Sequence, residues 1–147
     1  MSVLIAGAGP AGSRLAELLS KNGVVVTLVE RLKIHTQNAF SSAVLPLSAV
    51  AEHFLPDEVI STKWNTWQIS DSFGKLYRWS SHFDQGVVLD FAKLRSFLWT
   101  SAINSGVELK LGCTVTSVES SGNHAIVSLK DSSGFIFSRC VNIFVDA

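Results

Sequence analysis

The chain has 147 residues, enough for one domain, and its 12 basic and 12 acidic side chains cancel to a net charge of zero. This balance gives no sign of a nucleic-acid or anionic-membrane surface. Charged residues make up 16% of the chain, against roughly 25% in an ordinary soluble domain, while apolar residues make up 47%. The composition excludes a disordered chain and indicates that further protein normally covers part of the surface.

Several other classes of protein are also disfavoured. The longest apolar runs fall far short of the roughly 20 residues that cross a bilayer, and the N-terminus does not have the pattern of a secretion signal. Cys113 and Cys140 are too few and too far apart for a zinc site or a disulfide framework. Because free cysteine is commonly buried, both are expected to be buried. The histidines show no metal-ligand spacing. We expect a cytoplasmic protein with no transmembrane segment and no metal site.

The N-terminal segment predicts a strand, a helix and a second strand. Residues 2–6 form a short apolar run, and residues 24–29 form a β-branched one. Leucines at helical spacing predict a helix over 10–22 between them. Its apolar face is expected to comprise Ala11, Leu15, Ala16, Leu18 and Leu19. A unit of this kind implies a right-handed crossover between parallel strands.

The middle of the chain predicts a loop, a short helix and an antiparallel hairpin. Residues 31–40 have no periodic pattern, and residues 45–54 suit a short helix between prolines. Branched and aromatic residues at 64–70 and 76–80 flank a turn-forming segment, which predicts the hairpin. Its aromatic side chains either form cross-strand pairs or line a pocket for an apolar substrate; they are Trp64, Trp67, Tyr77 and Trp79.

The last third of the chain predicts a helix, a buried strand, a meander and a final strand. Asp90 is placed to cap a helix over 91–104. The apolar face of that helix is expected to comprise Leu94, Phe97, Leu98 and Ala102. Residues 107–111 are a candidate for another buried strand, and the apolar residues 141–145 are expected to return to the parallel sheet. Three alternating segments between them predict an antiparallel meander: 114–119, 125–129 and 135–139.

A glycine-rich turn, GAGPAG, connects the first predicted strand to the first predicted helix. Gly7 permits a tight turn, Gly9 allows a pyrophosphate to approach the backbone, and Gly12 allows the helix to pack against the strand. The N–H groups at the start of the helix favour an anion at this place. The candidate phosphate-binding residues are therefore Gly7, Gly9, Pro10, Ala11 and Gly12.

Glu30, at the end of the second predicted strand, supports the same interpretation. It follows Gly12 at the spacing at which an acidic side chain accepts hydrogen bonds from the hydroxyls of an adenosine ribose. An acid here also disfavours a 2′-phosphate, and therefore NADP, in this site. The turn and Glu30 together predict adenine-dinucleotide binding, although this fingerprint alone does not distinguish FAD from NAD.

The order of the segments resembles the FAD-dependent monooxygenases and reductases of the p-hydroxybenzoate hydroxylase and geranylgeranyl reductase type. The resemblance covers the whole chain. It is most specific in GAGPAGSRLAEL and VVVTLVER, and looser in FAKLRSFLWTSAINSGVELKLGCTV and NIFVDA. It implies an α/β fold, a Rossmann-like parallel sheet (the FAD/NAD(P)-binding fold) with an inserted antiparallel hairpin and a three-stranded β-meander. Residues 1–147 would be one FAD-binding domain, truncated at its C-terminal end, and residues 63–90 would belong to the substrate-binding layer.

The resemblance also implies roles for particular residues. The glycine turn would bind the FAD pyrophosphate, Glu30 would hold the ribose, and Arg31 would lie near the adenosine or the phosphates. The backbone at Val115 would face the adenine edge. Phe91 departs from the family, which often places an arginine or glutamine directed at the cofactor there. The family's second fingerprint, a Gly-Asp pair, would follow beyond Asp146, which we interpret as a strand-end residue.

Three functions are compatible with these patterns. The first is an FAD-dependent oxidoreductase, which by resemblance hydroxylates an organic substrate or reduces isoprenoid double bonds, with NAD(P)H as a candidate electron donor. The alternatives are an NAD-binding dehydrogenase domain and a non-catalytic interaction module. The expected partners are a small, apolar organic substrate and the remainder of the protein's own chain. No residue is placed well enough to be assigned as a catalytic acid or base; Arg14, Ser41 and Ser42 are weaker candidates for cofactor contacts.

Overall fold

The computed structural model describes residues 1–40 and 42–147, and only the backbone of Ser42. The chain divides into two compact units. The first consists of Met1–Gln37 and Arg95–Ala147, and the second consists of Asn38–Leu94. Helix α3 (Phe91–Asn104) begins in the second unit and continues into the first. No helix in the described part of the chain combines the length and the apolar character that a membrane span requires.

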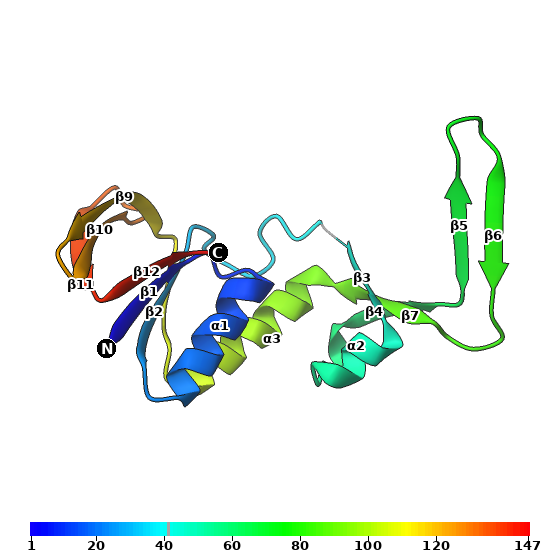
Figure 1. Ribbon diagram of the computed structural model, residues 1–147, viewed down its shortest axis with the longest axis horizontal. Coiled ribbons are helices and arrows are strands. Elements are labelled where there is room, and N and C mark those ends of the chain that lie inside the picture. Colours follow the sequence, from blue (N-terminus) through cyan, green and yellow to red (C-terminus); the bar gives the residue numbers. More distant parts are fainter. Residues whose placement is uncertain (41) are drawn as a thin grey trace. The chain divides into compact units, whose positions relative to one another are not determined.

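A parallel sheet forms the centre of the first unit (Figure 1). Its strand order is β12-β1-β2-β8, and the paired strands all run parallel. The strands are β1 (Ser2–Ala6), β2 (Val25–Glu30), β8 (Glu108–Leu111) and β12 (Ile143–Asp146). The Rossmann-like parallel sheet expected from the sequence is therefore confirmed, including the return of the final strand beside the first.

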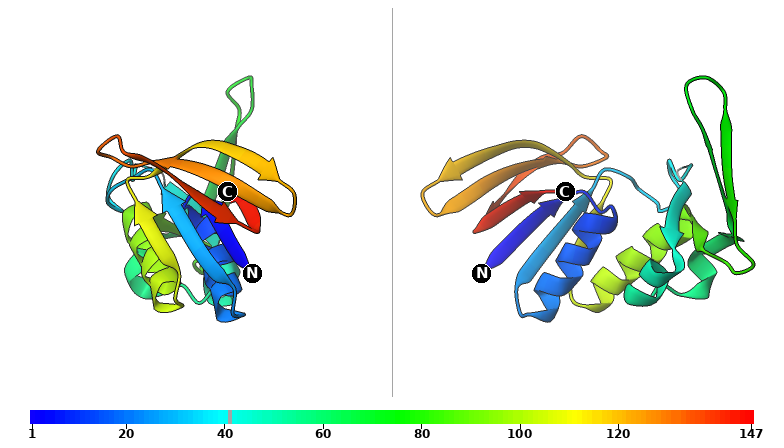
Figure 2. Two further views of the ribbon diagram at one scale, coloured as in Figure 1. Left: turned by 90° about the vertical axis from the view of Figure 1, so that its left-hand side faces the viewer. Right: turned by 45° about the vertical axis from the view of Figure 1, so that its right-hand side comes forward.

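Side chains alternate along these strands and serve two cores. Val3 and Ile5 lie in a core with residues of α1 (Pro10–Lys21) and α3, whereas Leu4 and Val29 lie in a core with residues of the meander. Figure 2 shows the two helices on one face of the sheet and the meander on the other. Because both faces are covered, the central strands β1 and β2 are largely apolar, which explains why they read as continuous apolar runs. The edge strand β8 carries Glu108 and Lys110 and, contrary to the expectation, is not buried.

The meander is an antiparallel sheet in the order β11-β10-β9, as the sequence predicts. Its strands are β9 (Thr114–Ser121), β10 (His124–Lys130) and β11 (Ile136–Val141). Val141 of β11 is buried, whereas its neighbour Cys140 is exposed. The expectation that both cysteines are buried is therefore wrong for Cys140 and correct for Cys113. Successive residues of a strand point to opposite faces, and only one face of this sheet packs on the core.

The second unit contains a small antiparallel sheet that the sequence did not predict. Its order is β3-β7-β4, and its strands are β3 (Ser42–Pro46), β4 (Ile60–Trp64) and β7 (Gly86–Asp90). A helix was expected over 45–54, but α2 (Leu47–Glu52) begins only after Pro46. Pro46 is the last residue of β3 and precedes the first residue of α2, with an extended ψ of 152°. A 3-10 turn, Asp57–Val59, leads into β4.

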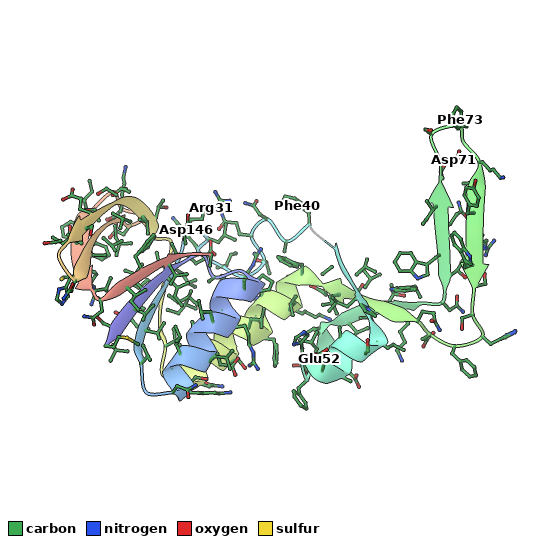
Figure 3. All side chains as sticks on the ribbon, viewed as in Figure 1. Arg31, Phe40, Glu52, Asp71, Phe73 and Asp146 are labelled. Atoms are coloured by element: carbon green, nitrogen blue, oxygen red, sulfur yellow. The ribbon has the colours of Figure 1, made fainter. Side chains whose placement is uncertain are left out.

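The aromatic hairpin of the second unit is formed by β5 (Thr66–Ser70) and β6 (Leu76–Ser80). The hairpin is confirmed, although its first strand begins at Thr66 and not at Trp64, which ends β4. Trp67 lies directly opposite Trp79 in the strand register, so these aromatic residues form a cross-strand pair. Asp71 and Phe73 lie at the tip of the hairpin (Figure 3). A carboxylate oxygen of Asp71 accepts hydrogen bonds from the amides of Phe73 and Lys75, at 3.0 and 2.9 Å. Asp71 therefore fixes the turn that sets this register.

The buried faces of α1 and α3 differ from those predicted. In α1, Leu18 is exposed, and Ser13 is buried instead. In α3, Leu94 and Ala102 are buried as expected, but so are two residues that the prediction left out, Arg95 and Trp99. Polar atoms on these unexpected residues have hydrogen-bond partners inside the protein, which allows their burial.

Candidate functional site

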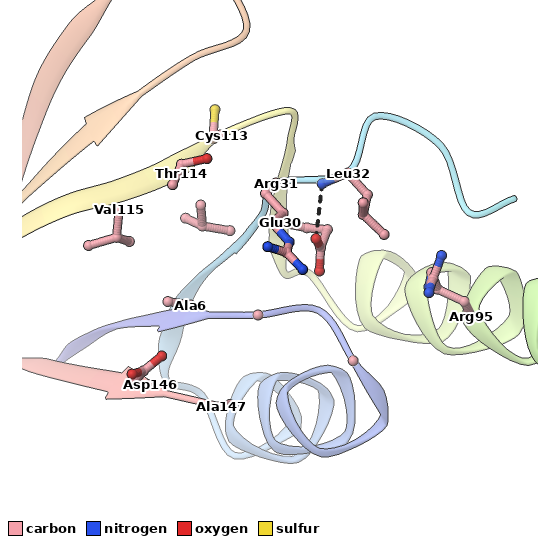
Figure 4. A pocket seen from close by; sticks show the side chains of 13 residues that line it. Ala6, Glu30, Arg31, Leu32, Arg95, Cys113, Thr114, Val115, Asp146 and Ala147 are labelled. Carbon is pink, nitrogen blue, oxygen red and sulfur yellow. Dashed lines mark hydrogen bonds between the residues drawn. The ribbon is translucent and has the colours of Figure 1, made fainter. Parts of the chain in front are cut away.

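A cavity of about 500 Å³ lies where β1, β2 and β12 end. The carboxyl ends of parallel strands are the usual place for a ligand in open α/β sheets. Of the eight predicted site residues, the structure brings five together around this cavity: Gly7, Gly9, Glu30, Arg31 and Val115 (Figure 4). The other three, Pro10, Ala11 and Gly12, form the first turn of α1 and do not line the cavity.

Gly7 and Gly12 are both required by the fold of the turn itself. Gly7 has φ of 102°, a left-handed conformation that favours glycine, and its amide donates to the carbonyl of Val29 at 2.8 Å. A Cβ at position 12 would lie 2.0 Å from the carbonyl oxygen of Gly7. The first turn of α1 can approach the strand end only because position 12 has no side chain.

Gly9 has a different environment. Its φ of −71° is accessible to any residue, and a Cβ added there would meet nothing within 4 Å. Within the described part of the chain its N–H has no hydrogen-bond partner, although it lines the cavity. Backbone conformation and packing therefore give no reason for glycine at this position. A ligand in the cavity could therefore approach the backbone closely at position 9.

The first turn of α1 adds further N–H groups. The first hydrogen bond of the helix joins the amide of Ser13 to the carbonyl of Gly9 at 2.9 Å. Helix geometry leaves the N–H groups of the preceding residues, Ala11 and Gly12, without a carbonyl partner, and Pro10 has no N–H to leave unpaired. These groups and the helix dipole favour an anion in front of the turn.

Glu30 is buried at the end of β2, and its carboxylate reaches back to the glycine turn. Oε2 accepts a hydrogen bond from the amide of Ala8, and Oε1 accepts one from the amide of Leu32, each at 2.9 Å; Figure 4 shows the second of these. A carboxylate has about four acceptor sites. Glu30 can therefore accept further hydrogen bonds from a ligand in the cavity while it keeps both backbone contacts.

Two arginines line the same cavity, and the sequence identified only one of them. Arg31 follows Glu30 and is exposed. Arg95, on α3, is buried, and its Nη1 donates to the carbonyls of His35 and Gln37 at 2.8 and 2.7 Å. It therefore holds the loop after β2. Phe91, where the family pattern has a cofactor-directed residue, precedes Arg95 by about one helical turn.

Trp99, also on α3, contacts the glycine turn. Its indole N–H donates to the carbonyl of Ala8 at 2.8 Å, and the ring is buried. Neither Arg95 nor Trp99 was expected to contribute to the site. The available signal was their spacing: residues four apart share one face of a helix, and these two adjoin the predicted apolar stripe.

The remaining candidates have ordinary structural surroundings. Asp146 ends β12, as interpreted from the sequence, and also lines the cavity. Arg14 pairs with Glu17 of the same helix at 2.7 Å. Ser41 lies outside the described residues, as does the side chain of Ser42. Among the residues that are described, no histidines, cysteines and carboxylates gather into a group able to hold a metal ion.

Comparison with known sequences connects the first part of this site to flavin binding. Residues 1–45 match the model of a family described as an FAD binding domain. This segment includes β1, the glycine turn, α1, β2 and Glu30. A search of curated protein sequences finds no significant match.

Solved structures share the fold of the chain. A geranylgeranyl bacteriochlorophyll reductase-like protein from Thermoplasma acidophilum has a TM-score of 0.86 at 18% identity, covering 99% of this chain and 38% of its own. A flavoprotein/dehydrogenase from Cytophaga hutchinsonii has a TM-score of 0.77 at 20% identity, covering 99% and 39%. A myxobacterial FAD-dependent chondrochloren halogenase has a TM-score of 0.72 at 21% identity, covering 99% and 36%.

These comparisons confirm the resemblance to flavin-dependent enzymes that the sequence motifs indicated. The chain has the α/β fold that such enzymes use, and its first 45 residues match a family that binds FAD. The chain spans less than two fifths of the length of each of the three solved chains described above.

Proposed function

We propose that this chain binds the ADP part of FAD in the cavity at the carboxyl ends of β1 and β2, as the FAD-binding part of a flavin-dependent oxidoreductase. The observation that carries this proposal is the environment of Gly9. Gly9 lines the cavity, its amide has no hydrogen-bond partner among the described residues, and its conformation and packing do not call for glycine. A diphosphate that lies against the backbone at position 9 explains the absence of a side chain there.

The residues around the cavity fit such a ligand. The amides of Gly9, Ala11 and Gly12 would bind the diphosphate, and the buried carboxylate of Glu30 would accept hydrogen bonds from the ribose hydroxyls. Arg31 would lie near the phosphates or the adenosine, and the backbone at Val115 would face the adenine. The flavin supplies the redox chemistry when it is bound, and these residues bind and orient it.

The match of residues 1–45 to an FAD binding family favours FAD over NAD. We propose that the intact protein is a monooxygenase or an isoprenoid-type reductase, with NAD(P)H as electron donor. Its substrate would be a small, apolar organic molecule. Residues 63–90 would contribute to the substrate-binding layer, since their hairpin exposes Trp67 and Trp79.

The identity of the bound cofactor tests this proposal directly. The intact protein should purify with bound FAD, identified by chromatography of the flavin that heating releases, and the Gly9→Val variant should purify without it. A colourless protein that binds NADH would instead favour an NAD-binding dehydrogenase. A folded protein that binds neither nucleotide would favour a non-catalytic interaction module.

A further inference from the structure

The carbonyl oxygen of Ala8, inside the glycine turn, accepts hydrogen bonds from two different helices. The indole N–H of Trp99 on α3 donates to it at 2.8 Å, and the hydroxyl of Ser13 on α1 donates to it at 3.1 Å. All three residues are buried. Two buried donors on the carbonyl of Ala8 restrict its orientation, in addition to the restriction from the turn itself.

This direction determines where the next N–H points. The peptide bond between Ala8 and Gly9 is trans, so the carbonyl of Ala8 and the N–H of Gly9 point in opposite directions from one planar group. Because the carbonyl points toward Trp99 in the core, the N–H of Gly9 points away from that core. Gly9 lines the cavity, and its N–H has no partner within the described residues.

The turn needs such a constraint because of the glycine that it contains. Glycine occupies positive and negative φ almost equally well, so rotation of the Ala8–Gly9 peptide unit encounters little steric resistance at position 9. A rotated unit would present the carbonyl oxygen to the cavity. An oxygen with a partial negative charge would repel the same anion that the N–H attracts.

We propose that Trp99 and Ser13 are positioning residues for diphosphate binding: by holding the carbonyl of Ala8, they direct the N–H of Gly9 at the phosphates. This inference rests on the proposed function, since it concerns the phosphates of the same ligand. It differs from a purely structural role for Trp99, whose ring also packs in the core between the sheet and the helices.

The two roles are separated by ligands with and without phosphates. We suggest measuring the affinities of ADP and adenosine for the intact protein by calorimetry or NMR titration. Trp99 is replaced by β-(3-benzothienyl)-L-alanine, which keeps the shape of the ring but has no N–H donor, and Ser13→Ala removes the second donor. Ser20→Ala is the matched control, because Ser20 of α1 also donates to a backbone carbonyl, that of Ser105 at 2.6 Å.

We expect either replacement to weaken ADP about tenfold, as for a hydrogen bond to a charged group, while adenosine changes less than about twofold. The Ser20→Ala variant should bind both ligands as the unmodified protein does. Unchanged ADP affinity in both variants, or an equal loss for ADP and adenosine, would overturn the inference. If the unmodified protein binds neither ADP nor FAD, the proposed function fails, and this inference fails with it.

Discussion

Glu30 and Ala8 are joined by a hydrogen bond of 2.9 Å between the carboxylate at the end of β2 and an amide of the glycine turn. The same carboxylate accepts the amide of Leu32, at the start of the loop after β2. Glu30 therefore has a structural role, holding the turn against the strand end, as well as the ribose-binding role that we propose. Any substitution at this position affects both.

Two substitutions of graded severity test the combined contribution of Glu30. Glu30→Gln keeps the side-chain length and one acceptor oxygen, enough for one of the two backbone amides, but it loses the charge and turns an NH2 group toward the other amide. Glu30→Ala removes every side-chain contact. We expect FAD affinity to fall by about 1.5–3 kcal/mol in Glu30→Ala and by less in Glu30→Gln, because hydrogen bonds to a charged acceptor are stronger than neutral ones. Flavin fluorescence titration measures both losses. Unchanged FAD affinity in Glu30→Ala would remove this residue from the site.

Positions 9 and 12 should respond differently to alanine. In Gly9→Ala the unfolding temperature of the apoprotein should be unchanged or slightly higher, because the conformation is ordinary and the space is open, while FAD binding weakens. Gly12→Ala should destabilise the apoprotein by about 1–3 kcal/mol, because its Cβ would collide with the carbonyl of Gly7.

Thermal unfolding and flavin content, measured on the same preparations, check both expectations. Gly12 is needed for the close packing of the helix at the glycine turn, as the sequence pattern indicated. The space that a Cβ would occupy at position 12 already belongs to the turn. A Gly9→Ala variant with full FAD affinity would contradict the role assigned to Gly9.

Arg95 should control the order of the loop after β2. In Arg95→Met the side chain keeps much of its length but loses both hydrogen bonds to the carbonyls of His35 and Gln37. We expect faster amide hydrogen exchange in residues 33–37 and weaker FAD binding. Arg139→Met is a suitable control, since Arg139 is exposed and pairs with Glu108 on the surface. Equal exchange rates in both variants would show that Arg95 does not hold the loop.

Glu17 provides a test of the electrostatics of α1. Burial of its carboxyl raises the pKa, but hydrogen bonds from Lys21 and Arg14 outweigh this effect, and the pKa is lowered overall. The stability that this carboxylate contributes is therefore present in full above the pKa of the unfolded chain. It is lost as the pH falls through the lower pKa of the folded state.

We expect an NMR titration of the Glu17 carboxyl carbon to give a pKa below the ordinary value of 4.5. Glu17→Gln should lower the free energy of unfolding by about 0.5–1 kcal/mol at neutral pH, since both partners are at the surface. The difference between this variant and the unmodified protein should shrink at acidic pH. A difference that grows on acidification would contradict the direction of the pKa change.

The parts of this fold that the sequence predicted are those with local signals. The glycine turn, the β-branched runs of β1 and β2, and the turns of the meander each specify their own conformation. The sheet β3-β7-β4 was missed because its strands lie far apart in the sequence and because Pro46, a residue uncommon in strands, ends β3. Their pairing depends on distant contacts, which residue patterns do not report.

The same distinction applies to the site. Gly9 and Glu30 belong to a spacing pattern and could be identified before the structure was known. The spacing of Arg95 and Trp99 places both on one face of α3, but it does not reveal their roles, because these depend on hydrogen bonds to backbone carbonyls about 60 and 91 residues away in the sequence. A carbonyl acceptor is present in every residue, so the sequence carries no mark of which one is used.

The contrast between the two glycines has an evolutionary consequence. At position 12 the carbonyl of Gly7 leaves no room for a side chain, whereas at position 9 a side chain would meet no other atoms of the protein within 4 Å. Selection for folding alone would preserve glycine at position 12 but would not preserve it at position 9. A homologue that has lost nucleotide binding but keeps the fold should therefore have residues other than glycine at position 9, while position 12 remains glycine. This difference between the two positions would distinguish such a homologue from one that still binds the nucleotide.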